Sequence, residues 1–140
     1  MAEFTYSGQQ TVSTNANVLF EQEVVGNSNC IKHRDGSGIV TLNGTTNQCK
    51  ARFLASFAAN IAVPDGGTAG EISLALALDG EAVLSSEMIS TPTATATFNN
   101  VASNIYIDVP RGCCASLSVK NTSTEDVDVS NANLIVTRIA

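Results

Sequence analysis

The sequence contains no tryptophan, one histidine and few charged side chains, and each shortage excludes a kind of site or surface. Aromatic residues make up 5% of the 140 residues, so the chain is poorly equipped for the stacked aromatic platforms of many glycan-binding sites. Charged residues make up 14%, against about a quarter in ordinary soluble domains, so much of the surface must be neutral and polar. This composition suits strands, turns and interfaces better than solvated helices.

Positive charge and long apolar runs are also scarce. The formal net charge is -6 and the pI is about 4.5, so phosphate backbones and anionic lipids are repelled, and we expect no nucleic-acid partner. No apolar run approaches a membrane span, and Met1–Tyr6 has neither the basic nor the apolar region of a signal peptide. We therefore expect no membrane insertion, synthesis as a soluble cytoplasmic protein, and a single domain over residues 1–140.

Four cysteines occur without any C-x-x-C pair, at positions 30, 49, 113 and 114. A structural zinc site needs ligands paired at short spacing, so we expect neither a metal nor a cofactor. Cys113 and Cys114 are adjacent and would face opposite sides of a strand. Reduced thiols that pack as small apolar residues are the default, and a Cys30–Cys49 disulfide stays open as an alternative.

Period-two alternation of apolar residues is the dominant pattern, and it predicts strands along the whole chain. Glu71–Leu78 alternates most clearly, and Asp79-Gly80 after it predicts a hairpin turn. Ala51–Val63 predicts a long strand covered on both faces, because half of its second face is also apolar. The other expected strands are Phe4–Ser7, Val18–Val25, Cys30–His33, Gly38–Leu42, Glu81–Leu84, Thr91–Thr97, Val101–Val109, Ala115–Lys120, Val127–Val129 and Ala132–Ile139. Short strands at this spacing, about ten in all, predict an all-β, antiparallel two-sheet jelly-roll sandwich.

No combination of residues predicts catalysis. His33, Arg34 and Asp35 are consecutive, and consecutive strand residues point apart, so we interpret them as a polar hairpin shoulder rather than a triad. In a trimer, a histidine near the threefold axis could still bind an ion from three identical positions. Glu21 and Glu23 share one face of a predicted strand, but nothing in the sequence places a substrate between them.

The acidic residues Glu125, Asp126 and Asp128, together with Asp108, offer oxygen ligands of the kind that Ca²⁺ prefers. They lack the spacing of a calcium loop, so a solvated turn that keeps the sheet edge soluble is the favoured interpretation. The chain also contains no G-x-S-x-G elbow, P-loop or dinucleotide fingerprint. We therefore expect that the protein is not an enzyme.

The order of strands and turns resembles the C1q/TNF-like jelly roll over nearly the whole chain, particularly its small microbial and bacteriophage versions. The resembling segments are Thr11-Val12, Val18–Phe20, His33–Leu42, Phe53–Val63, Ile72–Gly80, Leu117–Thr122 and Asn131–Ile139. Val109–Cys114 and Asn131–Val136 are similar to small proteins encoded among phage and prophage structural genes of gut Firmicutes. The chain lacks a collagen stalk and an aromatic-rich interface, which argues against a signalling or spore-surface role.

The resemblance implies a homotrimer in the virion, as head decoration, a head fibre or a tail-associated protein, with phage capsid or tail proteins as partners. Apolar residues on the second faces of 51–63 and 132–139 support a trimer, because a single sandwich would leave them in water. The predicted interface residues are Phe53, Leu54, Phe57, Tyr106, Leu134 and Val136.

The alternative is a carbohydrate- or receptor-binding module that contacts the surface of the bacterial host. Polar loops at Asn43–Gln48 and Asn99-Asn100 could hydrogen-bond a host surface glycan, and Val109–Cys114 could present an exposed arginine. The candidate contact residues are Arg111, Asn43 and Asn99.

Overall fold

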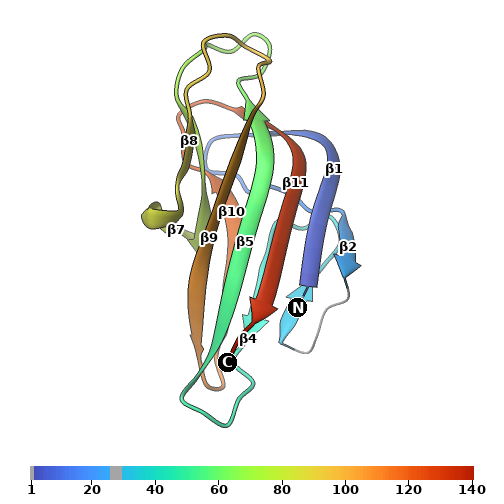
Figure 1. Ribbon diagram of the computed structural model, residues 1–140, viewed down its shortest axis with the longest axis vertical. Coiled ribbons are helices and arrows are strands. Elements are labelled where there is room, and N and C mark those ends of the chain that lie inside the picture. Colours follow the sequence, from blue (N-terminus) through green and yellow to red (C-terminus); the bar gives the residue numbers. More distant parts are fainter. Residues whose placement is uncertain (1, 26–29) are drawn as a thin grey trace.

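The computed structural model of the protein describes residues 2–25 and 30–140, and within them the chain forms strands arranged in two facing sheets (Figure 1). A short 3-10 turn, η1 (Leu84–Ser86), interrupts the strands. The described strands are β1 (Ala2–Val12), β2 (Gln22–Val25), β3 (Ile31–His33), β4 (Val40–Asn43), β5 (Lys50–Ala62), β6 (Ile72–Leu78), β7 (Glu81–Ala82), β8 (Met88–Ser90), β9 (Asn99–Pro110), β10 (Cys114–Asn121) and β11 (Val127–Arg138).

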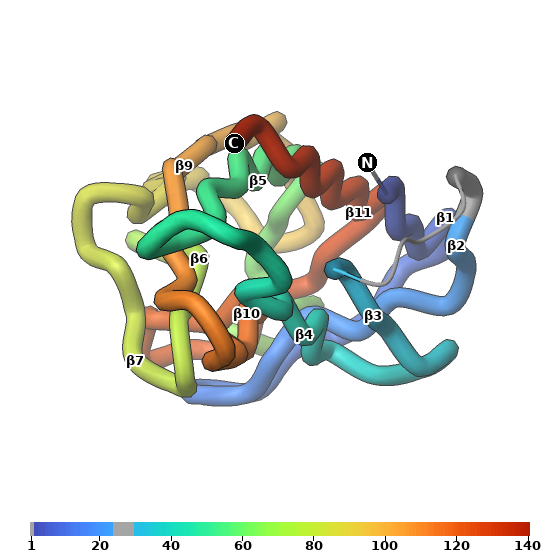
Figure 2. Tube along the Cα trace, turned by 90° about the horizontal axis from the view of Figure 1, so that it is seen from below, coloured from blue at the N-terminus to red at the C-terminus, as the bar shows by residue number. Residues whose placement is uncertain are grey.

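The two sheets have defined strand orders. One sheet has five strands in the order β2-β1-β11-β5-β9, and the other follows the order β3-β4-β10-β6-β7, with β8 also paired to β6. Every pair is antiparallel. Seen from below, β9, β5, β11 and β1 form one layer, and β6, β10, β4 and β3 form the other (Figure 2). The predicted antiparallel two-sheet sandwich is confirmed.

The core lies between the sheets and follows the alternation of the sequence. On β5 the inward residues are fully buried, from Ala51 and Phe53 to Ile61, and they meet the leucines of β6 and β10. Burial of each large apolar side chain stabilises the fold by about 1.5–3 kcal/mol. The second face of β6 is buried too, which the alternation did not predict, and on this face Ser73 contacts Thr122 through their hydroxyls at 2.6 Å.

The predicted hairpin turns are present. Asp79 and Gly80 have φ values of 53° and 84° and connect β6 to β7. The carboxylate of Asp79 also accepts a hydrogen bond from the N–H of Ser116 at 2.9 Å, which attaches the turn to β10. Residues 34–39 connect β3 to β4 as an antiparallel hairpin.

Several predicted strands differ from the structure. Thr91–Thr97 is a loop, because Pro92 has no N–H to donate and Ala96 adopts a φ of 58°, with its own N–H bonded to the Val63 carbonyl. In the segment predicted at 18–25, only Gln22–Val25 is a strand. The two short strands predicted after residue 126 are one strand, β11, which continues through an irregularity at Asn131, where φ is 56°.

Candidate functional site

The outer face of the five-stranded sheet has a neutral centre made of three cross-strand rows. The middle residues of these rows are Leu54, Ser56 and Ala58 on β5. Each row continues onto both neighbouring strands, with Thr137, Ile135 and Asn133 on β11 and Tyr106, Asn104 and Ala102 on β9. The three rows themselves contain only apolar and neutral polar side chains, and the carboxylate of Glu3 on β1 lies at their edge, where it accepts a hydrogen bond from Asn133 Nδ2 at 2.6 Å.

A shallow hollow lies in this face, and its lining includes the small side chains of Ser56, Ala58 and Ala102. Tyr106 extends from the same face with 70% of its surface exposed, while Leu54 and Ile135 are half-buried. A tyrosine is a large amphipathic side chain that is enriched in protein interfaces. The face therefore has the composition of a contact surface for another protein chain.

Four of the six predicted interface residues belong instead to the core of the single chain. Phe53, Phe57, Leu134 and Val136 have at most 1% of their surface exposed and point between the two sheets. Side chains alternate along a strand, so the surface is made by the neighbours of these four residues. Of the predicted set, Leu54 and Tyr106 lie on the outer face.

Several exposed or half-exposed apolar residues were not predicted from the sequence, among them Ile135, Leu84 and Ile89. Ile135 faces outward between the buried Leu134 and Val136. Because side chains alternate along a strand, the apolar residues on both sides of Ile135 in the sequence could have indicated its outward position. Leu84 in η1 is 72% exposed, and Ile89 in β8 is 55% exposed. Both lie in the segment at the free edge of the six-stranded sheet, a position that follows only from the strand order.

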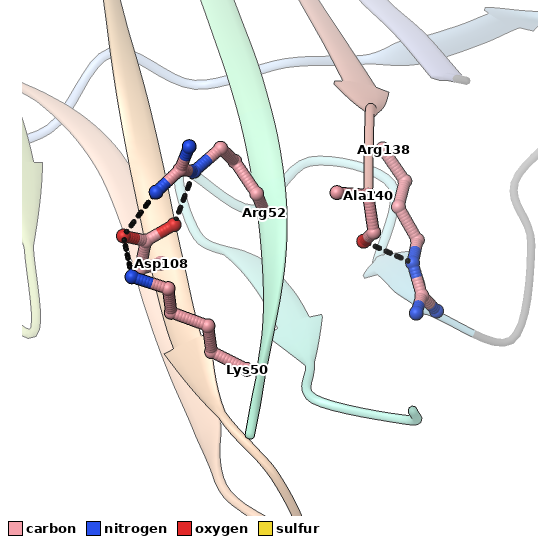
Figure 3. A network of polar contacts seen from close by, with 5 residues as sticks. All are labelled: Lys50, Arg52, Asp108, Arg138 and Ala140. Carbon is pink, nitrogen blue, oxygen red and sulfur yellow. Dashed lines mark hydrogen bonds and ion pairs between the residues drawn. The ribbon is translucent and has the colours of Figure 1, made fainter. Parts of the chain in front are cut away.

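A group of charged side chains lies at one end of the outer face. Asp108 on β9 accepts hydrogen bonds from Arg52 Nε at 2.7 Å and Arg52 Nη2 at 3.1 Å, and Lys50 Nζ lies 3.1 Å from its Oδ2 (Figure 3). The hydrogen bonds from Arg52 and Lys50 lower the pKa of Asp108 from its ordinary 3.8 to about 2. Two cations therefore share one carboxylate here.

The structure brings two of the three candidate contact residues together. Asn43 and Arg111 line one hollow at the lower end of the sandwich in Figure 1, where the connection after β4 meets the turn after β9. Asn99 lies at the other end of β9, opposite Ile61, and donates a hydrogen bond from Nδ2 to Ser90 Oγ at 3.1 Å. Asn99 therefore does not belong to the same site.

The acidic residues that were considered as a calcium site do not form one cluster. Asp108 faces Arg52 near the start of β5, whereas Asp128 faces Ala62 at its far end. Asp128 is buried and accepts hydrogen bonds from Thr11 Oγ1 at 2.6 Å and Gln9 Nε2 at 3.1 Å. Within residues 2–25 and 30–140, no three His, Cys, Asp or Glu side chains are placed to hold a metal ion.

The other polar residues considered for catalysis, namely His33 with its neighbours and the two glutamates, do not form a catalytic arrangement. His33 Nε2 donates to the Ser37 carbonyl at 2.8 Å, and its ring packs against Phe4 and Phe20 with centroids 4.8 and 6.3 Å away. Arg34 and Asp35 beside it are exposed, as expected for a hairpin shoulder. The two glutamates do not share a strand, since β2 begins at Gln22 and includes only Glu23.

The four cysteines lie in segments that meet at the lower end. Cys49, Cys113 and Cys114 are exposed, and Cys30 is half-buried with Arg138 Nη1 3.0 Å from its Sγ. No disulfide joins Cys30 to Cys49. In the part of the chain that the structure describes, no helix is long and apolar enough to span a membrane.

Comparison with known proteins identifies the architecture. No protein-family model matches the chain, and no curated protein does. Among solved structures, the globular domain of the zebrafish complement 1qA protein matches with a TM-score of 0.62 at 10% identity, over 96% of this chain and 94% of that one. Murine APRIL matches with 0.66 at 11% identity, over 99% and 98%. Eiger TNF from S. frugiperda matches with 0.69 at 15% identity, over 99% and 91%.

These matches cover almost the whole of each chain at low identity, so they show the fold. The protein is an all-β jelly roll of the C1q/TNF-like type, as the sequence predicts.

Proposed function

We propose that the protein is a non-enzymatic homotrimer whose assembly covers the outer face of the five-stranded sheet. The observation that carries the proposal is Tyr106, which is 70% exposed on the same face as Leu54 and Ile135. In a single chain these side chains remain partly in water. Burying a side chain of this size is worth about 1.5–3 kcal/mol, so a contact over the whole face is favourable.

A second apolar surface on the same chain supports a ring. Leu84 and Ile89 are exposed at the edge of the other sheet, on elements that do not belong to the five-stranded sheet of Tyr106. A contact between two different surfaces of identical chains is head-to-tail, and such contacts generate rings when the rotation closes. We propose that the edge with Leu84 and Ile89 packs on the face with Leu54 and Tyr106 of the next copy. The proposed number of chains in the ring, three, is taken from the resemblance of the sequence to the C1q/TNF-like family.

The place of this trimer is proposed from the same resemblance. We place it in a bacteriophage virion, as head decoration, a head fibre or a tail-associated protein, after synthesis in the host cytoplasm. The partners are then capsid or tail proteins, and the role is symmetric packing. Mass spectrometry of purified virions tests this part, and absence of the chain from them would overturn it.

The trimer itself is tested by sedimentation equilibrium at micromolar concentration. Wild-type protein is expected at three times the chain mass of 14.5 kDa. Tyr106→Glu and Leu84→Glu place a charge in either half of the contact, and both variants are expected to sediment as folded monomers. Ile39→Glu is the matched control, because Ile39 is 46% exposed outside both surfaces. A monomeric wild type, or dissociation by Ile39→Glu alone, would contradict the proposal.

A further inference from the structure

We propose that the hollow between residues 43–46 and residues 111–113 binds an acidic saccharide, with Arg111 holding the sugar carboxylate. This inference goes beyond the proposed assembly. The hollow lies at the lower end of the sandwich in Figure 1, where the loop after β4 and the turn after β9 come together. It is separate from the neutral face that carries Tyr106, so binding and assembly can be tested independently.

The backbone of the hollow is held in place before any ligand binds. The N–H of Gly44 donates to the Cys113 carbonyl at 2.9 Å, and the N–H of Gly112 donates to the Gly44 carbonyl at 3.1 Å. Arg138 Nη1 donates to the Thr45 carbonyl at 2.6 Å, which ties the same loop to the end of β11. A ligand that binds here orders little additional backbone, and this lowers the entropic cost of binding.

Gly44 is required for this close approach. A Cβ atom at position 44 would overlap the carbonyl oxygen of Pro110, so no larger residue fits without moving the turn. Gly112 has a φ of 76°, which glycine adopts without strain. The two glycines therefore set the distance between the loop and the turn, and with it the width of the hollow.

Arg111 is the cation that remains available at this end. Lys50 and Arg52 both bind Asp108, and Arg138 donates to the carbonyl oxygen of Ala140 (Figure 3). Arg138 also donates to the carbonyl oxygen of Thr45. Among the described residues, none forms a hydrogen bond or an ion pair with the guanidinium of Arg111, which is exposed. An arginine without an acidic partner beside a preformed hollow offers its guanidinium to a carboxylate of a ligand.

The chemistry of the lining points to a sugar acid. A guanidinium binds a carboxylate through two parallel hydrogen bonds. The opposite wall, residues 43–46, includes two threonines, whose hydroxyl groups are neutral partners suited to sugar hydroxyl groups. The single unpaired cation of the hollow matches a sugar unit that carries one carboxylate. The lining has no large apolar side chain that would bind an apolar side chain of a peptide.

The experiment is a titration of the ¹⁵N-labelled full chain with sialyllactose and with a galacturonate oligomer, using lactose as the neutral probe. We expect the amide resonances of Gly44 and Gly112 to shift with at least one acidic saccharide and to stay in place with lactose. Arg111→Gln should weaken this binding about tenfold or more, the loss expected for a charged hydrogen-bonded pair. Arg34→Gln is the matched control, an exposed arginine in another hairpin, and should leave the affinity unchanged.

Each other outcome overturns the inference. Equal binding of lactose, no binding of either acidic saccharide, or full affinity in Arg111→Gln would exclude a carboxylate site at Arg111. A triglutamate peptide that binds as tightly and with the same dependence on Arg111 would assign the hollow to acidic peptides instead. Sedimentation of the same Arg111→Gln sample separates this result from assembly, because the variant is expected to remain trimeric.

Discussion

Arg52 and Asp108 face each other across β5 and β9 and are joined by two hydrogen bonds, of 2.7 and 3.1 Å, from one guanidinium to both carboxylate oxygens. The pair lies on the outer face next to the row of Leu54 and Tyr106. Lys50 provides a second positive charge for the same carboxylate. Since all three side chains are exposed, solvent and salt screen the interaction, and its contribution to stability is small.

The contribution of Asp108 to stability should disappear in acid. Its pKa is lowered from 3.8 to about 2 in the folded protein, so the stabilisation is fully present above the unfolded value and is lost as the pH falls through about 2. We expect the melting temperatures of wild type and Asp108→Asn to differ by a constant amount above about pH 5 and to converge near pH 2. Thermal unfolding across this range measures it, and molar salt should reduce the difference. A difference independent of pH would contradict the assignment.

The two faces of β5 should respond differently to truncation. Phe57 is buried between the sheets, so Phe57→Ala is expected to cost about 3–5 kcal/mol of unfolding free energy. Leu54 lies half-buried on the outer face, and Leu54→Ala should cost less than about 1 kcal/mol in a single chain. Urea denaturation in a Leu84→Glu background, a change outside the five-stranded sheet, removes the effect of assembly from both values. Equal losses at the two positions would show that the faces are assigned wrongly.

Alternation and turn chemistry made most of the fold predictable. Glu71–Leu78 and Asp79-Gly80 contain a strand and its turn within a few neighbouring residues, and the structure has both. Thr91–Thr97 was mistaken for a strand, because the hydrogen bond from Ala96 to Val63 depends on a distant segment. The residues around position 96 do not indicate that Val63 will lie beside them in the fold.

The candidate interface was predictable only in part, for a related reason. Alternation shows that Phe53 and Leu54 lie on opposite faces of a strand, but the direction of the core depends on which sheet lies behind it. The prediction assigned both residues to the interface, although Phe53 belongs to the core. The meeting of Asn43 with Arg111 needs the complete strand order of both sheets, which no spacing in the sequence specifies.

Asn121 should be among the polar residues that matter most for stability. It is fully buried, and its Nδ2 donates to the carbonyl oxygens of Val12 and Glu125 at 2.9 Å each, while its Oδ1 accepts from the N–H of Ser123 at 2.9 Å. Asn121→Ala leaves these groups without partners and is expected to cost about 2–4 kcal/mol. Asn47→Ala, in an exposed turn, should change stability by no more than about 0.5 kcal/mol. Chemical denaturation compares the two, and a similar small loss in both would contradict the role of Asn121.

Substitution at Gly44 should separate the loop after β4 from the turn after β9. The Cβ of Gly44→Ala would overlap the Pro110 carbonyl oxygen, so the two segments must move apart, at a cost of about 1–3 kcal/mol. Gly70→Ala is the matched control, because nothing lies within 4 Å of the added Cβ atom. Alanine lowers the conformational entropy of the unfolded chain, so this substitution should be neutral or stabilising by up to about 1 kcal/mol. Urea denaturation gives both values, and the amide spectrum of Gly112 reports the displacement of the turn. If Gly44→Ala and Gly70→Ala have the same stability and Gly112 does not shift, the close contact between the loop and the turn is absent in solution.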